Sequence, residues 1–355
     1  MEIGILTACT GKPQKNKGLY DIINEIDERE DINYRIINPQ DIFFEGNNFK
    51  YYKRKKEYIF SRNKKDEFVG RKWLKENEVR LFKEEFSDVD YLYIRGFKPA
   101  SWESEPIIVK RAIEKLDIPM TNSLESIKYC NNKIYSILDI LTCNIEIDGF
   151  ELKELIPKTR IFNLKNSNPE NKEEVKEYIR TRFQGGHTPV VAKDHNGRGG
   201  GGIMPFPIGS PYRALIDNYE RTNFIVQDMK EGCIDLRVQI VGSGYYENDI
   251  KGSYIREPSE GDFRAQYNKK KEHYELSELQ KKISLWIHKR SGVDISAIDF
   301  LLNPDTDEIY FLEINGENPG WKNLKKVYKD DEIISKNGLA PYLIDHMIDK
   351  YRLLK

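Results

Sequence analysis

The chain has 355 residues, of which 57 are Lys or Arg and 58 are Asp or Glu, so its formal net charge is −1. This length accommodates two or three domains, and the near-neutral charge argues against a dedicated nucleic-acid-binding protein. No apolar run approaches the roughly 20 residues that a membrane span needs, and residues 1–12 do not resemble a signal peptide. Four scattered cysteines without a CxxC pair fit a reducing compartment, and five histidines show no zinc-ligand spacing. We therefore expect a cytoplasmic protein with no membrane partner.

The N-terminal part alternates predicted strands and helices. Residues 3–8 and 34–38 read as strands, and residues 19–26 between them have helical apolar spacing. This order predicts a parallel sheet, and residues 90–95 add another strand that ends at Arg95. The carboxyl end of a strand in such a sheet is a usual ligand position. Arg95 is therefore either a ligand contact or an ordinary surface arginine.

Residues 50–72 are rich in Lys and Arg with interleaved tyrosines, as in KYYKRKKEYIFSRNKK. One interpretation is a basic surface for an anionic partner such as an acidic peptide, a nucleotide or RNA. The other is a solvated hairpin or helix face, whose charge is balanced by acidic residues elsewhere.

A glycine-rich segment follows a short apolar strand that ends near Lys193. The segment TPVVAKDHNGRGGGGI matches neither the Walker pattern nor GxGxxG at the start of a helix. Glycines allow close backbone approach, with N–H groups turned toward a phosphate chain. A phosphate-covering loop and a flexible surface hairpin are the two interpretations of Gly199, Gly200 and Gly201.

Further polar residues lie at the ends of predicted elements. Gln227 and Asp228 end the strand 224–228, where they could serve a nucleotide base. Arg256 and Arg264 lie on neighbouring segments, and the guanidinium fork suits phosphate. Helices are predicted over residues 126–141, 172–182, 275–291 and 342–354.

Residues 293–321 predict a hairpin with a polar turn at 303–307. Period-two alternation predicts that one face carries Ile309, Phe311, Glu313 and Asn315. A turn centred near Thr306 places Asp299 opposite Glu313, where two carboxylates repel unless a cation lies between them. Two carboxylates and an amide oxygen are ligands that suit Mg²⁺. The alternative is a hairpin at the edge of a sheet whose polar residues face solvent.

The order and spacing of these motifs, from about residue 90 to 320, resemble an ATP-grasp ligase of the RimK and glutathione-synthetase-like branch. The segments on which this resemblance rests are NNKIYSIL, PKT at 157–159, VVAKDHNGRGGGGI, FIVQDM, DLRVQIVG, GDFRAQ, AIDFLL and FLEINGENPG. Three features depart from the family pattern. Gln266 replaces the usual asparagine, the connection from FIVQDM to DLR is short, and the loop after Asn315 is one residue longer.

The resemblance implies a role for each matching residue. Implied nucleotide contacts are Lys133, Lys193, Gly199, Gly200, Gly201, Gln227, Asp228, Met229, Glu231, Asp235 and Gln266. Implied catalytic arginines are Arg256 and Arg264, and implied metal ligands are Asp299, Glu313 and Asn315. The cofactors are then ATP and Mg²⁺, with Mn²⁺ as a substitute.

The resemblance also implies the architecture, of mixed α/β and α+β class. An N-terminal open-sheet domain, residues 1–120 with the basic insertion, precedes a two-subdomain ATP-grasp fold. Residues 121–226 form the subdomain with the glycine-rich lid, and residues 227–355 form the subdomain with the metal site.

The implied function is ATP-dependent ligation of a carboxylate to an amine through an acylphosphate, with amino acids or peptides as substrates. An acidic peptide at the basic insertion and a homo-oligomer are compatible with this function. One alternative is an ATP-grasp kinase for a polyol or inositol-type hydroxyl. Another is a nucleotide-dependent peptide- or RNA-binding protein.

Overall fold

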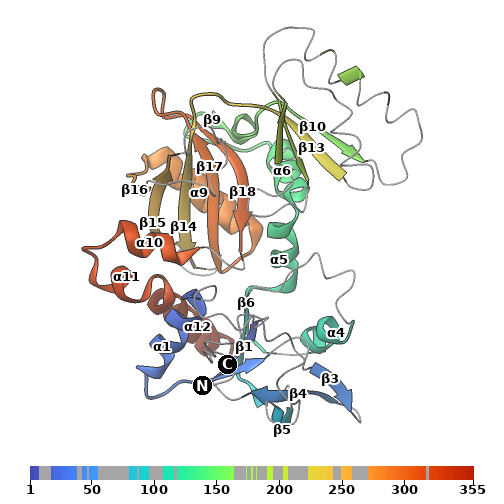
Figure 1. Ribbon diagram of the computed structural model, residues 1–355, viewed down its shortest axis with the longest axis vertical. Coiled ribbons are helices and arrows are strands. Elements are labelled where there is room, and N and C mark those ends of the chain that lie inside the picture. Colours follow the sequence, from blue (N-terminus) through green and yellow to red (C-terminus); the bar gives the residue numbers. More distant parts are fainter. Residues whose placement is uncertain are drawn as a thin grey trace, which may run out of the picture.

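The computed structural model describes residues 1–7, 17–37, 42–45, 48–54, 80–85, 88–95, 107–115, 118–163, 173, 177–178, 181, 190–194, 203–206, 223–242, 249–257, 271–316 and 320–355. Figure 1 shows a lower lobe with both chain termini and an upper part that contains two further sheets. The mixed α/β architecture confirms the predicted fold class.

The N-terminal sheet is parallel, as predicted, with strand order β2-β1-β6-β7. Its strands are β1 (Glu2–Thr7), β2 (Asn33–Ile37), β6 (Tyr91–Arg95) and β7 (Met120–Thr121). Helices α1 (Lys17–Asp27) and α4 (Ile107–Lys115) belong to the same lobe. All five residues of β6 are buried, as expected of a central strand in a sheet covered on both faces.

A small antiparallel sheet contains the start of the basic stretch. Its strands are β3 (Ile42–Glu45), β4 (Asn48–Arg54) and β5 (Arg80–Glu85). Residues 50–54 lie on β4, and Lys50 Nζ lies 3.3 Å from Glu85 Oε1 on β5. The rest of the basic stretch lies outside the described residues, so its role stays a prediction.

The predicted helix over residues 126–141 is two helices, α5 (Leu124–Asn131) and α6 (Lys133–Thr142). Asn132 has extended backbone dihedrals and ends α5. Its side chain accepts a hydrogen bond from the Ile134 N–H at 3.0 Å, which caps α6. This break makes Lys133 the first residue of α6. The predicted helix over residues 172–182 lies mostly outside the described residues.

The second sheet is antiparallel, with strand order β10-β13-β11-β12. Its strands are β10 (Thr159–Asn163), β11 (Val190–Asp194), β12 (Ile203–Phe206) and β13 (Asn223–Asp228). The chain reaches it through β8 (Glu146–Ile147), β9 (Phe150–Glu151) and the 3₁₀ helix η5 (Leu152–Leu155).

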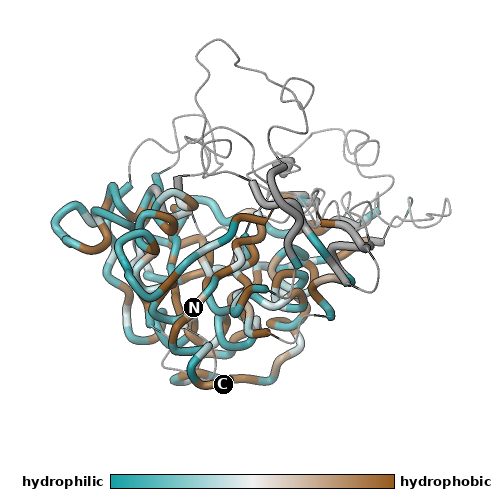
Figure 2. The backbone as a smooth tube through the Cα atoms, turned by 90° about the horizontal axis from the view of Figure 1, so that it is seen from below, coloured by the Kyte–Doolittle hydropathy of each residue, from teal (hydrophilic) through white to brown (hydrophobic). Residues whose placement is uncertain are grey.

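The third sheet is antiparallel, with strand order β16-β15-β14-β17-β18. Its strands are β14 (Ile234–Val241), β15 (Asp249–Arg256), β16 (Lys271–His273), β17 (Ile295–Leu302) and β18 (Ile309–Asn315). Helix α9 (Glu278–Ser291) begins with a capping box from Ser277 and Gln280 and ends at Gly292, whose φ is +67°. Buried Ile283 and Ile287 of α9 join the apolar face of this sheet in one core. Figure 2 shows hydrophobic and hydrophilic segments alternating along the chain, as amphipathic elements require.

The C-terminal helices return to the N-terminal lobe. They are α10 (Trp321–Val327), α11 (Glu332–Asn337) and α12 (Ala340–Leu354). Leu343, Ile344 and Met347 of α12 share one buried core with residues of β1 and α1. The three-part division at residues 120 and 226 stays a prediction, and α12 links its first and last parts.

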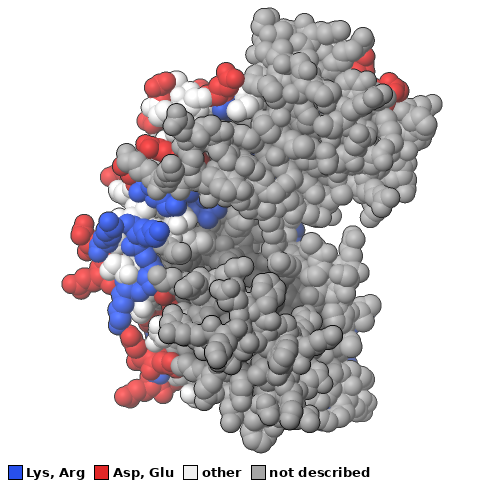
Figure 3. Space-filling view, in the orientation of Figure 1, with Lys and Arg blue, Asp and Glu red and all other residues white. Residues whose placement is uncertain are grey.

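Figure 3 shows lysine and arginine side chains over the region of α10 and α11, bordered by acidic side chains. Two lysines of α10 and α11 are paired with acidic residues of α1 and the residue after it. Lys325 Nζ lies 2.7 Å from Asp21, and Lys336 Nζ lies 2.9 Å from Glu28. Among the described residues, no helix has both the length and the apolar character to cross a membrane.

Candidate active site

One face of the five-stranded sheet carries charged side chains from four strands. The cross-strand register places Asp299 opposite both Arg237 and Glu313, and Asp235 opposite Arg256. The other face carries apolar residues of the same strands, which pack with α9. The alternation of β14 and β17 therefore produces a polar layer on one side of the sheet and a core on the other.

The prediction that Phe311, Glu313 and Asn315 share one face of β18 is wrong for Phe311. Asp299 pairs with Glu313, as predicted, but the next pair is Phe300 with Phe311, so a β-bulge interrupts the register. Phe311 and Ile314 are buried in the core with α9. Glu313 and Asn315 lie on the opposite, polar side. The extra residue of a bulge shifts the alternation by one position, which period-two counting cannot anticipate.

Asp299 lies at the centre of the polar face and is 4% exposed. Arg237 binds it with both arms of the guanidinium, Nε to Oδ1 and Nη2 to Oδ2, each at 2.6 Å. Arg256 Nη2 reaches Asp299 Oδ1 at 3.0 Å. Burial raises the pKa of Asp299, but the nearby charges of Arg237 and Arg256 bring this pKa below its usual value. Asp299 is therefore a carboxylate at neutral pH.

Asp235 is the second buried acid, and Arg256 Nη2 donates to its Oδ1 at 2.6 Å. Burial raises its pKa to about 6, with Asp299 adding to this rise and Arg256 opposing it. Arg256 thus bridges two acids from neighbouring strands. Asp235 and Arg256, which are both predicted site residues, lie on the polar face.

On β18, Glu313 and Asn315 lie next to Asp299 of the neighbouring strand β17. The Asn315 amide nitrogen donates to Asp299 Oδ2 at 3.2 Å and to Glu313 Oε1 at 3.3 Å. Lys133 Nζ, at the start of α6, lies 3.0 Å from Glu313 Oε2. The structure therefore brings all three predicted metal ligands and the first predicted ATP lysine into one cluster.

The second predicted lysine projects from β11 of the other sheet. Lys193 is 7% exposed, and its Nζ donates to Gln227 Oε1 at 2.7 Å. Burial and the charge of Lys133 together lower the pKa of Lys193 to about 8, and the charge of Glu313 opposes this change. The charges of Lys133 and Glu313 therefore act on Lys193, although its hydrogen bond goes to Gln227.

Gln227 has a different setting from the one expected for a base contact. Its Oε1 accepts from Lys193 and its Nε2 donates to Thr159 Oγ1 at 2.9 Å, so its amide holds the lysine in place. Thr159 belongs to the PKT segment that the resemblance includes, but only the antiparallel pairing of β10 with β13 places it opposite Gln227.

The remaining predicted residues fall into two groups. Asp228 ends β13, while Met229 and Glu231 lie in the connection from β13 to β14. Their contact with a nucleotide base or ribose stays a prediction. The other group is Gly199, Gly200, Gly201, Arg264 and Gln266, all outside the described residues.

The donor set fits a magnesium ion that arrives with phosphate. The described residues contain no group of three or more His, Cys, Asp and Glu side chains able to hold a metal. The side chains that lie together and carry oxygen donors are the carboxylates of Asp299 and Glu313 and the amide of Asn315, whose nitrogen faces both carboxylates. Such hard oxygen ligands suit Mg²⁺, which usually keeps only one or two protein carboxylates and takes phosphate oxygens as well.

The charge of the cluster points in the same direction. Four basic residues, Lys133, Lys193, Arg237 and Arg256, face three acids, Asp235, Asp299 and Glu313. This excess of positive charge favours a polyanion, and lysines with arginines are the groups that bind phosphate.

Sequence and structure comparisons identify the family. The RimK-like ATP-grasp domain profile matches residues 151–336, which is more than half of the chain. The chain belongs to the RimK-like ATP-grasp family. The predicted resemblance is thereby confirmed, and the protein is an ATP-grasp ligase that uses ATP. No curated protein matches the chain significantly by sequence.

Solved ATP-grasp structures share the fold over nearly the whole chain. VanG D-Ala:D-Ser ligase from Enterococcus faecalis matches with a TM-score of 0.65 and 16% identity, over 99% of each chain. Macrocyclase MdnC from Microcystis aeruginosa MRC, bound with precursor peptide MdnA, has a TM-score of 0.61 and 16% identity. That match covers 97% of this chain and 100% of MdnC. The Chryseobacterium gregarium RiPP-associated ATP-grasp ligase has a TM-score of 0.60 and 17% identity, over 97% and 96% of the two chains.

Proposed function

We propose that this ATP-grasp enzyme is an ADP-forming, Mg²⁺-dependent carboxylate–amine ligase that acts on an amino acid or a peptide. The observation that carries the proposal is the cluster of Asp299, Glu313 and Asn315 with Lys133 and Lys193 beside it. Fold neighbours with amino-acid or peptide substrates named in their descriptions support the substrate class.

The proposed reaction has two steps. An oxygen of the substrate carboxylate attacks the γ-phosphorus of ATP, the bond to the β-phosphate oxygen breaks, and ADP leaves. The amine then attacks the carbonyl carbon of the acylphosphate, the carbon–oxygen bond breaks, and inorganic phosphate leaves with an amide as product. The ammonium form of the amine loses one proton to become the nucleophile, and the nitrogen loses a second proton as the amide forms; the departing phosphate takes up one of these protons and solvent takes the other.

The described side chains suit this chemistry because phosphoryl transfer depends on alignment and charge neutralisation. Lys133 and Lys193 stand where they can neutralise phosphate charge, and Gln227 holds Lys193 through its amide. Arg237 and Arg256 keep Asp299 ionised, so this carboxylate stays a ligand at neutral pH. A bound Mg²⁺ would be held by Asp299, Glu313 and Asn315, and it would supply charge neutralisation for the phosphates.

A hydroxylamine trap tests the proposal. The enzyme is incubated with MgATP, hydroxylamine and panels of amino acids, peptides and polyols, and ADP, hydroxamate and phosphoester are measured. A ligase gives ADP together with a hydroxamate from its carboxylate substrate, because hydroxylamine intercepts the acylphosphate. ADP with a phosphoester and no hydroxamate would instead indicate the kinase, and absence of ADP formation across the panels would contradict both enzymes.

A further inference from the structure

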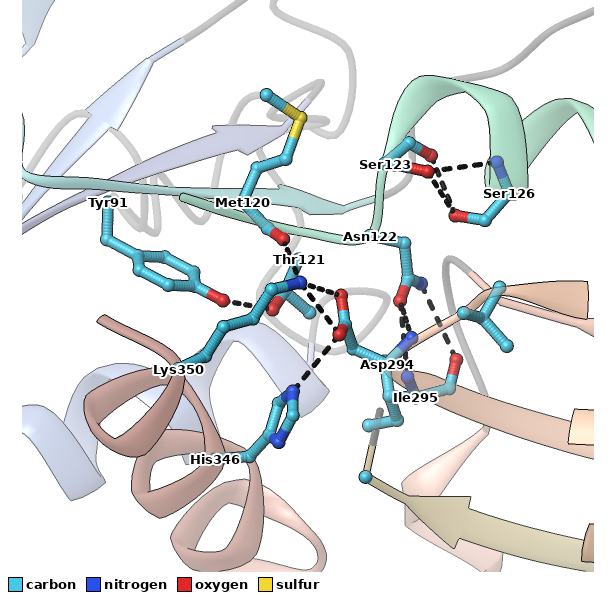
Figure 4. A network of polar contacts seen from close by, with 12 residues as sticks. Tyr91, Met120, Thr121, Asn122, Ser123, Ser126, Asp294, Ile295, His346 and Lys350 are labelled. Carbon is cyan, nitrogen blue, oxygen red and sulfur yellow. Dashed lines mark hydrogen bonds and ion pairs between the residues drawn. The ribbon is translucent and has the colours of Figure 1, made fainter. Parts of the chain in front are cut away.

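The side chain of Asn122 lies where the N-terminal sheet meets the two strands that carry the candidate metal ligands. It follows directly after β7 and is 0% exposed. Figure 4 shows its amide facing the start of β17. A buried amide needs partners for its oxygen and its nitrogen, and here both sets of partners come from the metal-ligand strands.

The amide oxygen of Asn122 binds the start of β17. It accepts from the Asp294 N–H at 2.7 Å and from the Ile295 N–H at 3.2 Å. Four residues farther along the same strand is Asp299. The amide oxygen therefore fixes the beginning of the strand that carries the first ligand.

The amide nitrogen of Asn122 binds the end of β18. It donates to the carbonyl oxygen of Gly316 at 2.6 Å, and Gly316 directly follows Asn315. The last pair of the β17–β18 ladder is Ala297 with Asn315, so the Asn122 amide joins the two strands where the ladder ends. The Asn122 side chain thus links the two strands just beyond their last backbone pair.

The packing around Gly316 shows how close this approach is. A Cβ at this position would lie 2.9 Å from Val293 Cγ1, 3.2 Å from Cys130 Sγ and 3.3 Å from Asn122 Nδ2. A larger residue would force the backbone after Asn315 away from Asn122. The absence of a side chain at Gly316 therefore allows the Asn122 amide to approach the backbone this closely.

Asn122 is itself held firmly in place. On the preceding residue, the Thr121 hydroxyl shares a 2.6 Å hydrogen bond with the Tyr91 hydroxyl on β6. Lys350 of α12 donates to the Met120 carbonyl at 2.8 Å and pairs with Asp294 at 2.8 Å (Figure 4). Beyond Asn122, Ser123 caps α5, accepting from the Ser126 N–H at 3.1 Å.

The segment that begins at Asn122 contacts β18 again at its far end. It continues through α5 to Lys133, whose Nζ reaches Glu313. The two ends of residues 122–133 therefore contact the same region, one at the Gly316 backbone directly after β18 and the other at the Glu313 side chain of β18.

We propose that Asn122 is a positioning residue, which fixes Asp299 and Asn315 for the cation by tying together the start of β17 and the end of β18. This role rests on the metal site of the proposed function. Asn122 does not touch the cation. It acts through the backbone of Ile295 and Gly316. Groups that hydrogen-bond directly to the ligand side chains typically change metal affinity by about 10- to 100-fold when they are replaced, and we take this range as the scale of the expected effect.

The decisive variant is Asn122→Asp. The aspartate keeps an oxygen for the two N–H groups of β17, and its ionised form presents a second oxygen that repels the Gly316 carbonyl. Tyr91→Phe is the matched control, because it removes a buried hydrogen bond next to Asn122 without touching β17 or β18. Gly316→Ala is an independent variant that disturbs the same contact from the other side.

The measurement is Mn²⁺ affinity, determined by electron paramagnetic resonance titration in the presence of the non-hydrolysable analogue AMP-PNP, with thermal unfolding recorded alongside. We expect Asn122→Asp and Gly316→Ala to weaken Mn²⁺ binding about 10- to 100-fold. Tyr91→Phe should lower the melting temperature but keep the wild-type Mn²⁺ affinity.

Two results would overturn the inference and are distinguishable. Folded Asn122→Asp or Gly316→Ala with the Mn²⁺ affinity of Tyr91→Phe would show that Asn122 serves stability alone. A wild-type protein that binds no Mn²⁺ with AMP-PNP would remove the metal site itself, and the role of Asn122 with it.

Discussion

Glu313 is the candidate ligand whose replacement separates metal binding from folding. Its carboxylate contacts Lys133 and Asn315 on the polar face, not the apolar core. Glu313→Gln keeps the size of the side chain but removes one anionic ligand, so we expect ADP formation to fall by orders of magnitude. The melting temperature without nucleotide should change little.

The control is Glu308→Gln, on the exposed turn of the same hairpin, which should leave ADP formation unchanged. Turnover at the wild-type rate in Glu313→Gln with saturating Mg²⁺ would contradict the assignment.

His288 makes the stability of the protein depend on pH. It is 0% exposed and lies 2.8 Å from both Ser296 Oγ and the Gly242 carbonyl. Burial lowers its pKa from 6.5 to about 4. The neighbouring charge of Asp294 raises this pKa, and that of His346 lowers it. The folded state thus favours the neutral ring. This contribution is fully present above pH 6.5 and is lost as the pH falls toward 4.

We expect this group to lower the free energy of unfolding by about 2 kcal/mol between pH 7 and pH 5, measured by urea titration. His288→Gln should remove most of that dependence, whereas His273→Gln, on the exposed strand β16, should retain it. An unchanged pH dependence in His288→Gln would show that other groups cause it.

At the scale of elements, the glycine-rich segment connects two paired strands. Val190 to Lys193 of β11 pair with Phe206 to Ile203 of β12, so residues 195–202 join the ends of a hairpin that begins beside Lys193. A nucleotide held by Lys193 should be covered by this connection, which excludes water from the phosphates. Hydrogen exchange of the 195–204 peptide should therefore slow when AMP-PNP and Mg²⁺ are added. Equal exchange in both states would favour a surface hairpin.

The basic stretch is a second element with a specific test. Lys50 is already paired with Glu85, and the stretch begins on a strand of a small separate sheet. If the stretch binds an acidic peptide, reversal of Lys53, Arg54, Lys55 and Lys56 to glutamate should raise the KM for that substrate. The effect should weaken with salt, because exposed charges are screened over about 10 Å at 0.1 M. An unchanged KM in the variant, with no salt effect, would leave the stretch a solvated face.

At the scale of the whole molecule, the two ends of the chain share one core. Leu343 of α12 is 0% exposed and belongs to the apolar cluster that includes Ile3 and Leu19. Leu343→Ala should lower the free energy of unfolding by about 2–5 kcal/mol, since it removes buried methyl groups and leaves a cavity. Leu353→Ala on the same helix, where the side chain is 67% exposed, should cost less than about 0.5 kcal/mol. Equal losses in a chemical denaturation experiment would show that α12 is not part of the common core.

The sequence by itself predicted many of the elements and named most of the residues that form the polar cluster. Alternation and turn chemistry predicted the β17–β18 hairpin and the pairing of Asp299 with Glu313, because both depend on neighbours within a few positions. The order of motifs predicted the family, and the resemblance implied nucleotide contacts for Lys133 and Lys193.

Only the tertiary structure decided which distant groups complete the site. The bulge that turns Glu313 and Asn315 toward Asp299 shifts the alternation by one residue, and the break at Asn132 interrupts an otherwise helical pattern. Arg237 meets Asp299 from 62 positions away, and Asn122 reaches Gly316 across 194 positions. Such contacts depend on sheet register and on the docking of the N-terminal sheet against β17 and β18. These arrangements result from the packing of the whole chain, so no local pattern encodes them.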